Sequence, residues 1–85
     1  MTKAYVIEMD DEGASTFHLF TDKTVFDSAK AADDNDTGLM EWFSAEGDLG
    51  QAIHDAPSFH SVKDLTKYLK ANDLDLKDQI KGYFF

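Results

Sequence analysis

Two stretches near the N-terminus alternate between apolar and other side chains, and this alternation limits the fold more than any other feature. In Lys3–Met9 every second residue from Tyr5 onward is bulky and apolar, and Ser15–Thr21 alternates in the same way around Phe17. Asp10–Gly13 joins them, and its glycine is free to take the positive φ of a tight loop. Alternation on both sides of a short glycine-containing loop predicts an antiparallel β-hairpin.

The segment after the hairpin is predicted to be a helix. Thr21 or Asp22 is suited to cap its first turn, and apolar residues then recur at helical spacing to about Ala32. The alternative is a third strand over Thr24–Phe26, entered through a tight turn at Asp22-Lys23. That turn lacks the glycine or asparagine that two-residue hairpins prefer, so the helix is favoured.

Two further helices are predicted in the second half of the chain. Asp48 is suited to cap a short helix that ends before Pro57. Ser61 is suited to cap a second helix over Val62–Ala71, because its hydroxyl can accept a hydrogen bond from an N–H group of the first turn. The apolar residues of that helix recur at spacings of three and four, which indicates one buried face. We expect this face to bury Val62, Leu65 and Leu69.

One more strand and one more helical turn complete the predicted fold. Leu39–Ser44, which contains Trp42, is most simply a third strand. Asp75–Ile80 is predicted to be a last helical turn, capped by Asp75. Together the elements predict one α+β domain over residues 1–85, with a small antiparallel sheet covered by about three helices.

The charge of the chain is unevenly distributed. Residues 1–56 hold thirteen acids against three lysines, a charge of −10, whereas residues 57–85 hold four acids against five lysines, a charge of +1. The net charge of −9 therefore comes from the first part of the chain. A field of this sign repels nucleic acid and anionic lipid and attracts basic surfaces. The chain also lacks arginine, the preferred residue for bidentate phosphate and base recognition.

Several other classes of protein are disfavoured by the composition. Without cysteine there is no disulfide, no thiolate metal site and no cysteine nucleophile, and the chain fits the reducing cytoplasm, where we expect it. Its apolar runs are far shorter than the about 20 residues that cross a bilayer. Met1–Asp10 has no apolar run behind a positive segment, so we expect no signal peptide.

No motif predicts an enzyme, a metal or a cofactor. Asp33–Gly38 matches the first half of a calcium-binding EF-hand loop, but Ser44 stands where that loop needs a bidentate glutamate. The histidines lack zinc-ligand spacing, and the glycines are too scattered for a phosphate-binding loop. We therefore expect a non-enzymatic protein in which the Asp33–Gly38 segment is a solvated loop.

The function predicted best is that of a small acidic binding protein. It would inhibit a partner by occupying a basic, nucleic-acid-binding surface, in the manner of phage anti-defence and nuclease-immunity proteins. The candidate partner-binding residues are Asp10, Asp11, Glu12, Asp33, Asp34, Asp36, Glu41 and Trp42. The alternative is a structural or regulatory interaction module whose acidity serves solubility and which makes contact through an aromatic patch or an exposed sheet edge. A small-ligand or cation-binding domain is a third, weaker reading.

For two aromatic segments, the sequence does not decide whether the side chains lie in the core or in an interface. Trp42 follows the acidic Glu41, as an interface anchor would, but burial under the helices explains it equally well. The C-terminal Tyr83–Phe85 has the same two explanations, and docking into the core is favoured because exposed aromatic patches are uncommon.

Overall fold

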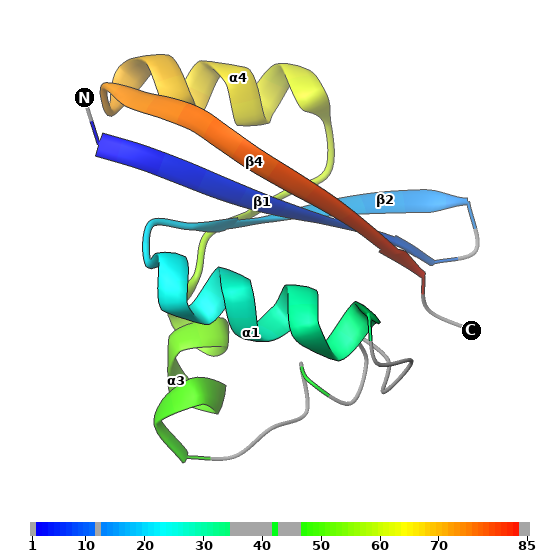
Figure 1. Cartoon of the computed structure of the whole chain (residues 1–85). Coiled ribbons are helices and arrows are strands. Elements are labelled where there is room, and N and C mark those ends of the chain that lie inside the picture. The colour runs from blue at the N-terminus through cyan, green and yellow to red at the C-terminus, as the bar shows by residue number, and fades with distance from the viewer. Residues whose placement is uncertain (1, 12, 35–41, 43–46, 84–85) are drawn as a thin grey trace.

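The computed structural model describes residues 2–11, 13–34, 42 and 47–83 of the 85-residue chain. They form an α+β fold in which a β-sheet lies between two layers of helices (Figure 1). The elements in chain order are β1 (Thr2–Asp11), β2 (Ala14–Phe20), α1 (Lys23–Asp34), α3 (Gly47–Asp55), β3 (Ser58–Phe59), α4 (Val62–Ala71) and β4 (Leu74–Tyr83). Helices α1 and α3 cover one face of the sheet, and α4 covers the other.

The sheet is mixed and has the strand order β3-β2-β1-β4 among the described strands. Strands β1 and β2 form the predicted antiparallel hairpin, in which Tyr5 lies opposite Phe20 and Asp11 opposite Ala14. Gly13 has the positive φ of 85° that its loop position requires. Strand β3 adds antiparallel to β2, and β4 adds parallel to β1.

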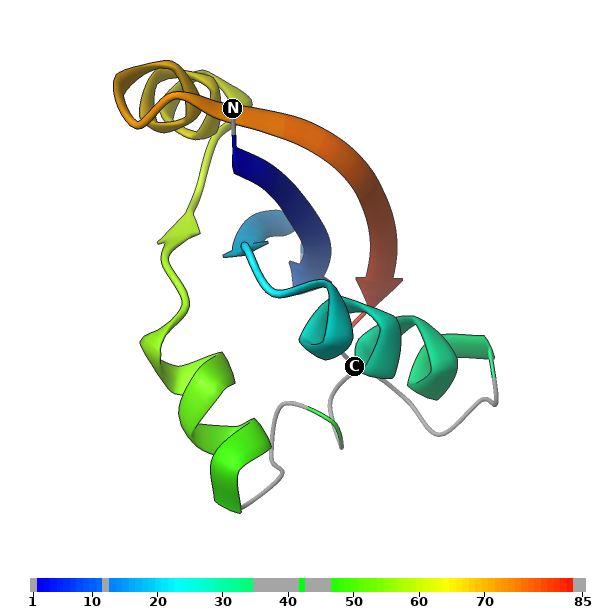
Figure 2. The same cartoon turned by 60° about the vertical axis from the view of Figure 1, so that its left-hand side comes forward.

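Strand β4 corrects the prediction of a last helical turn over Asp75–Ile80. These residues lie in a ten-residue strand that runs beside β1, the strand at the other end of the chain (Figure 2). The prediction was wrong because Leu76 and Ile80 have a spacing that also suits a helix. Pairing with β1 is a tertiary interaction, and such interactions override local propensity in strands.

A β-bulge in β4 determines which face of the sheet its apolar residues reach. Ala4 lies opposite Leu76, but the next residue of β1 lies opposite Asp78, so Lys77 is an extra residue in the ladder. One inserted residue exchanges the faces of all later side chains, because the period of a strand is two. As a result, Leu74 packs on the α4 side of the sheet and Ile80 on the α1 side.

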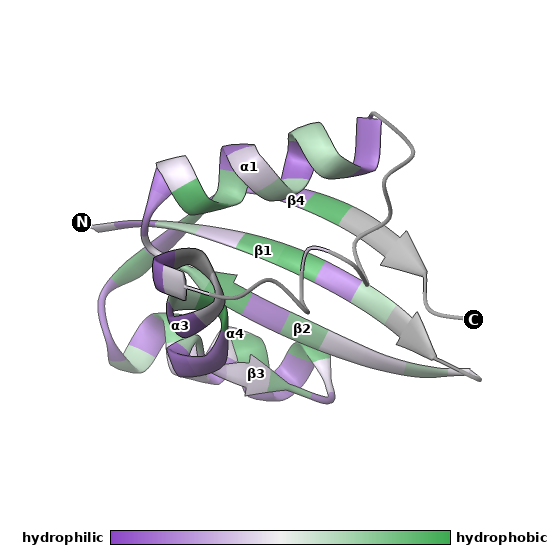
Figure 3. Cartoon of the chain, turned by 90° about the horizontal axis from the view of Figure 1, so that it is seen from below, coloured by the Kyte–Doolittle hydropathy of each residue, from purple (hydrophilic) through white to green (hydrophobic). Residues whose placement is uncertain are grey.

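The sheet separates two apolar clusters, and the central strand β1 contributes to both. The cluster on the α1 and α3 side comprises Tyr5, Ile7, Met9, Phe20, Phe26, Ala29, Trp42 and Ile53. The cluster on the α4 side comprises Ala4, Val6, Phe17, Leu19 and Leu65. Because both faces of β1 are covered, four consecutive residues from Ala4 to Ile7 are buried. Figure 3 shows β1 in the middle of the sheet, with hydrophobic residues along it.

The N-terminal caps of α1 and α4 are those predicted. One carboxylate oxygen of Asp22 accepts hydrogen bonds from the backbone N–H groups of Thr24, at 2.8 Å, and Val25, at 3.4 Å. The alternative of a strand beginning at Thr24 is therefore wrong. The Ser61 hydroxyl accepts a hydrogen bond from the Asp64 N–H at 3.2 Å. Both contacts satisfy N–H groups that have no partner within a helix.

The predicted buried face of α4 is only partly correct. Leu65 is buried and Leu69 is half-buried, but 63% of Val62 is exposed. Val62 occupies the first helical position, where the apolar cluster beneath α4 does not include it. Sequence periodicity shows which side of a helix is apolar, but it does not show how many residues of that side the sheet covers.

The third strand predicted over Leu39–Ser44 falls almost entirely outside the described residues. Trp42 is the described member of this segment, and its backbone is helical rather than extended. The described third and fourth strands are instead β3 and β4. The sheet is thus larger and less uniform in direction than the three-stranded antiparallel sheet that the sequence predicted.

Candidate functional site

Asp33 and Asp34 form the exposed C-terminal end of α1. The sequence predicted that they lie in a loop, but they are the last two residues of the helix. The C-terminal end of a helix carries the negative end of its dipole, which favours basic residues and disfavours acids. The last turn of α1 contains no basic residue. The two carboxylates therefore lie where the helix itself gains nothing from their charge.

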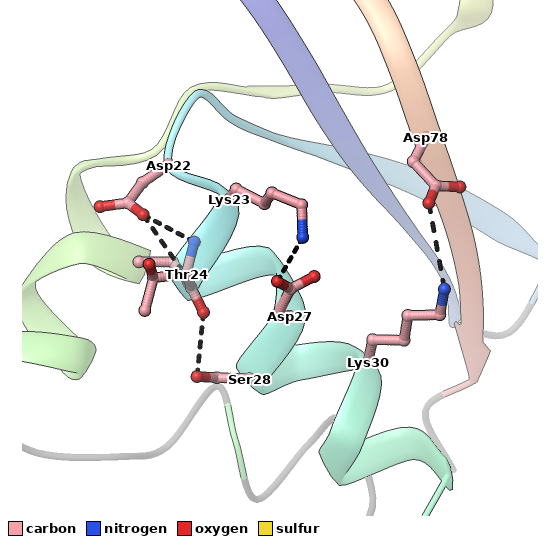
Figure 4. A network of polar contacts seen from close by, with 8 residues as sticks. Asp22, Lys23, Thr24, Asp27, Ser28, Lys30 and Asp78 are labelled. Carbon is pink, nitrogen blue, oxygen red and sulfur yellow. Dashed lines mark hydrogen bonds and ion pairs between the residues drawn. The ribbon is translucent and has the colours of Figure 1, made fainter.

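The two lysines of α1 lie earlier in the helix (Figure 4). The Lys23 ammonium is 2.7 Å from the Asp27 carboxylate, and this hydrogen bond raises the pKa of Lys23. The Lys30 ammonium is 4.0 Å from the Asp78 carboxylate of β4 and links the helix to the edge of the sheet. All four side chains are exposed, so these pairs contribute little to stability. They leave the last turn of α1 without a neutralising cation among the described residues.

The remaining acids of the predicted site are only partly described. Asp10 and Asp11 are the last residues of β1, and their backbones pair with Ser15 and Ala14 of β2. Glu12, Asp36 and Glu41 lie outside the described residues. The C-terminal ends of β1, β4 and α1 lie toward the same end of the molecule (Figure 1).

Trp42 belongs to the core and not to an exposed interface. It is 6% exposed, and its indole packs edge-to-face against Phe20, with ring centroids 5.7 Å apart. It lies in the apolar cluster on the α1 and α3 side of the sheet. Its prediction as a partner-binding residue is corrected, because a side chain buried in this way has no surface left for an interface anchor.

The sheet divides the charge of the described helices. From Asp22 to the end of α3 there are six described acids and two described lysines, on one side of the sheet. Helix α4, on the other side, carries three lysines and one acid. The sequence predicted an acidic first part and a weakly basic second part. What it did not predict is that helices of opposite charge would cover opposite faces of one sheet.

A basic surface on α4 was missed in the sequence analysis. Lys63, Lys67 and Lys70 follow one another at spacings of four and three, which places them on one side of the helix. They line an open groove of about 440 Å³. A second cavity of about 420 Å³ lies between α4 and β3 and shares Lys67 with the groove. The lysine spacing is the signal that was available in the sequence, whereas the cavity depends on β3.

The surroundings of His18 disfavour its protonation. It lies half-buried on β2, opposite Ser58 of β3. Burial lowers its pKa, and the nearby His60 lowers it further. Both effects disfavour the charged imidazolium form.

No site for a metal ion and no membrane-spanning helix is found in the part of the chain that the structure describes. No three side chains of histidine, aspartate or glutamate come together there as a metal-binding group. None of the described helices has the length and apolar character to cross a bilayer. No family model, curated protein or solved structure matches this chain.

Proposed function

We propose that this chain is a non-enzymatic inhibitor whose acidic face occupies a basic, nucleic-acid-binding surface of a partner protein. Phage anti-defence proteins and nuclease-immunity proteins act in this manner. In this proposal the chain acts in the cytoplasm, a setting that suits its lack of cysteine. It needs no cofactor and contacts neither nucleic acid nor membrane directly.

The observation that carries the proposal is the position of Asp33 and Asp34. Acids at the C-terminal end of a helix each disfavour that helix by about 0.3–1 kcal/mol at low ionic strength. Residues that oppose the local structure in this way are concentrated at functional sites. Both side chains are exposed and neither forms an ion pair with another described residue. Their charge is therefore available to a basic partner.

The surrounding charge supports the same conclusion. The described residues from Asp22 to the end of α3, on one side of the sheet, have an excess of four negative charges, six acids against two lysines. Opposite charges on two proteins accelerate their encounter and make it sensitive to salt. Exposed carboxylates also offer a basic surface the negative charge that it otherwise takes from phosphates.

The experiment compares two double variants that remove the same charge. Asp33→Asn with Asp34→Asn alters the proposed face, whereas Asp73→Asn with Asp75→Asn alters exposed acids next to α4 and β4. The partner is first captured from the native host on the tagged wild-type chain. Its association with each variant is then measured by surface plasmon resonance at low and at physiological salt.

We expect the Asp33 and Asp34 variant to associate about tenfold more slowly and with a weaker salt dependence. The same variant should unfold at a slightly higher denaturant concentration, because it removes two negative charges from the negative end of the α1 dipole. The Asp73 and Asp75 variant should associate as the wild type does, and DNA or RNA should displace the captured partner. Equal association rates for both variants, or a partner that nucleic acid does not displace, would overturn the proposal in favour of the interaction-module alternative.

A further inference from the structure

The cavity between α4 and β3 combines an apolar wall with a polar rim that carries one lysine and one acid. Phe59 and Tyr68 form the apolar wall, with ring centroids 5.0 Å apart. His60 and Lys67 lie on the same cavity, and Ala71 lines its wall beside Tyr68. It has a volume of about 420 Å³ and is widely open to solvent, so it can hold one side chain of a ligand against its wall.

We propose that this cavity binds an apolar or aromatic side chain of an acidic peptide, whose carboxylates lie along the lysines of α4. The groove formed by Lys63, Lys67 and Lys70 continues from the cavity, because Lys67 lines both. A peptide that places one side chain in the cavity can therefore extend across the lysines. This site is on the face of the sheet opposite to α1, and the inference does not rest on the proposed function.

The charge of the site explains why its ligand is acidic. None of the three lysines forms an ion pair within the described residues, so their charges remain available. The excess of acids near α1 and α3 lies on the far side of the sheet. Surface charges separated by more than a Debye length, about 8 Å at physiological ionic strength, are largely screened from one another. The local positive charge of α4 is thus not cancelled by the net charge of the molecule.

A substitution at Asp64 can change ligand binding without disturbing the fold. It is the acid that lines the cavity, and its carboxylate repels an acidic ligand. Its backbone N–H donates to Ser61, a contact that does not require the carboxylate. Replacing Asp64 by asparagine therefore removes the repulsion and keeps the cap. If the asparagine variant binds the peptide more tightly, misfolding cannot be the cause, because a misfolded protein would bind it more weakly.

A peptide fits this surface better than a nucleic acid does. A row of three lysines without arginine provides few phosphate contacts, and the affinity of nucleic-acid binders depends on many such contacts. The cavity has room for one apolar side chain against the Phe59 and Tyr68 rings. An apolar anchor surrounded by complementary charge is the usual arrangement in peptide and protein recognition.

The test uses a short glutamate-rich peptide with one central phenylalanine, labelled for fluorescence anisotropy. A peptide with alanine in place of the phenylalanine measures the contribution of the cavity. The variants are Lys67→Gln, Asp64→Asn and Ala71→Leu, which fills the cavity from the exposed side of α4. Lys77→Gln removes one exposed lysine from the opposite edge of the sheet and serves as the matched control.

We expect the phenylalanine peptide to bind the wild type in the micromolar to millimolar range. Lys67→Gln and Ala71→Leu should each weaken binding by about tenfold, a change of about 1.4 kcal/mol. Asp64→Asn should strengthen it, and Lys77→Gln should leave it unchanged. The alanine peptide should bind more weakly than the phenylalanine peptide.

Four results would overturn the inference. They are no binding of the phenylalanine peptide, equal loss in Lys67→Gln and Lys77→Gln, equal binding of the two peptides, and tighter binding of a single-stranded oligonucleotide. Sedimentation of the wild type at several concentrations covers one further case. Self-association that Lys67→Gln abolishes, without peptide binding, would assign the groove to a second copy of this chain and would also overturn the inference.

Discussion

At the scale of single residues, His18 is expected to make stability depend on pH. Its pKa is lowered in the folded state by burial and by His60, so the unfolded chain takes up a proton first as the pH falls. The free energy of unfolding should be constant above the usual histidine pKa of about 6.5 and should decrease below it. Urea denaturation between about pH 7 and pH 5 measures this decrease.

The His18→Gln variant should have a smaller decrease in stability over the same pH range. The matched control is His54→Gln, which changes an exposed histidine of α3 and should retain the decrease of the wild type. An undiminished pH dependence in the His18 variant would show that other groups cause it.

At the scale of elements, one residue after the end of α4 has an unfavourable backbone conformation that a single substitution can relieve. Asp73 follows the C-terminal cap Asn72 and has a φ of 54°, in the left-handed region that glycine adopts without steric cost. Asp73→Gly should raise the free energy of unfolding by about 0.5–1 kcal/mol. Asp73→Ala removes the same charge but retains a Cβ atom, so it should not stabilise the protein. Chemical denaturation measures the free energy of unfolding of both variants. Equal changes in the two would indicate that the loss of charge, and not the backbone conformation, causes the stabilisation.

At the scale of the whole molecule, the net charge predicts that the chain binds neither DNA nor RNA. The chain has no arginine, and the three lysines of α4 make too few phosphate contacts for counterion release to drive association, while the charge of −9 repels a polyanion. A mobility-shift titration at low salt should give no complex, although the basic side of α4 then has its greatest effect. Specific micromolar binding of any oligonucleotide would contradict both the inhibitor proposal and the assignment of the α4 groove to a peptide.

The sequence by itself determined the elements whose signals are local. The hairpin, the capping of α1 at Thr21 or Asp22 and the start of α4 at Ser61 all depend on residues within a few positions of one another. Each is confirmed, with Asp22 as the cap of α1. The net charge is likewise a property of composition. Such features are predictable because the interacting groups are neighbours in the chain.

Only the tertiary structure decided the features that depend on distant parts of the chain. The parallel pairing of β4 with β1 converted an expected helical turn into a strand, and the bulge at Lys77 then divided its apolar residues between two faces. Packing against Phe20 placed Trp42 in the core, where the sequence had left core and interface open. The α4 cavity exists because β3, which pairs with the distant strand β2, lies beside that helix. In each case the deciding contact joins residues far apart in sequence, and local propensity contains no information about it.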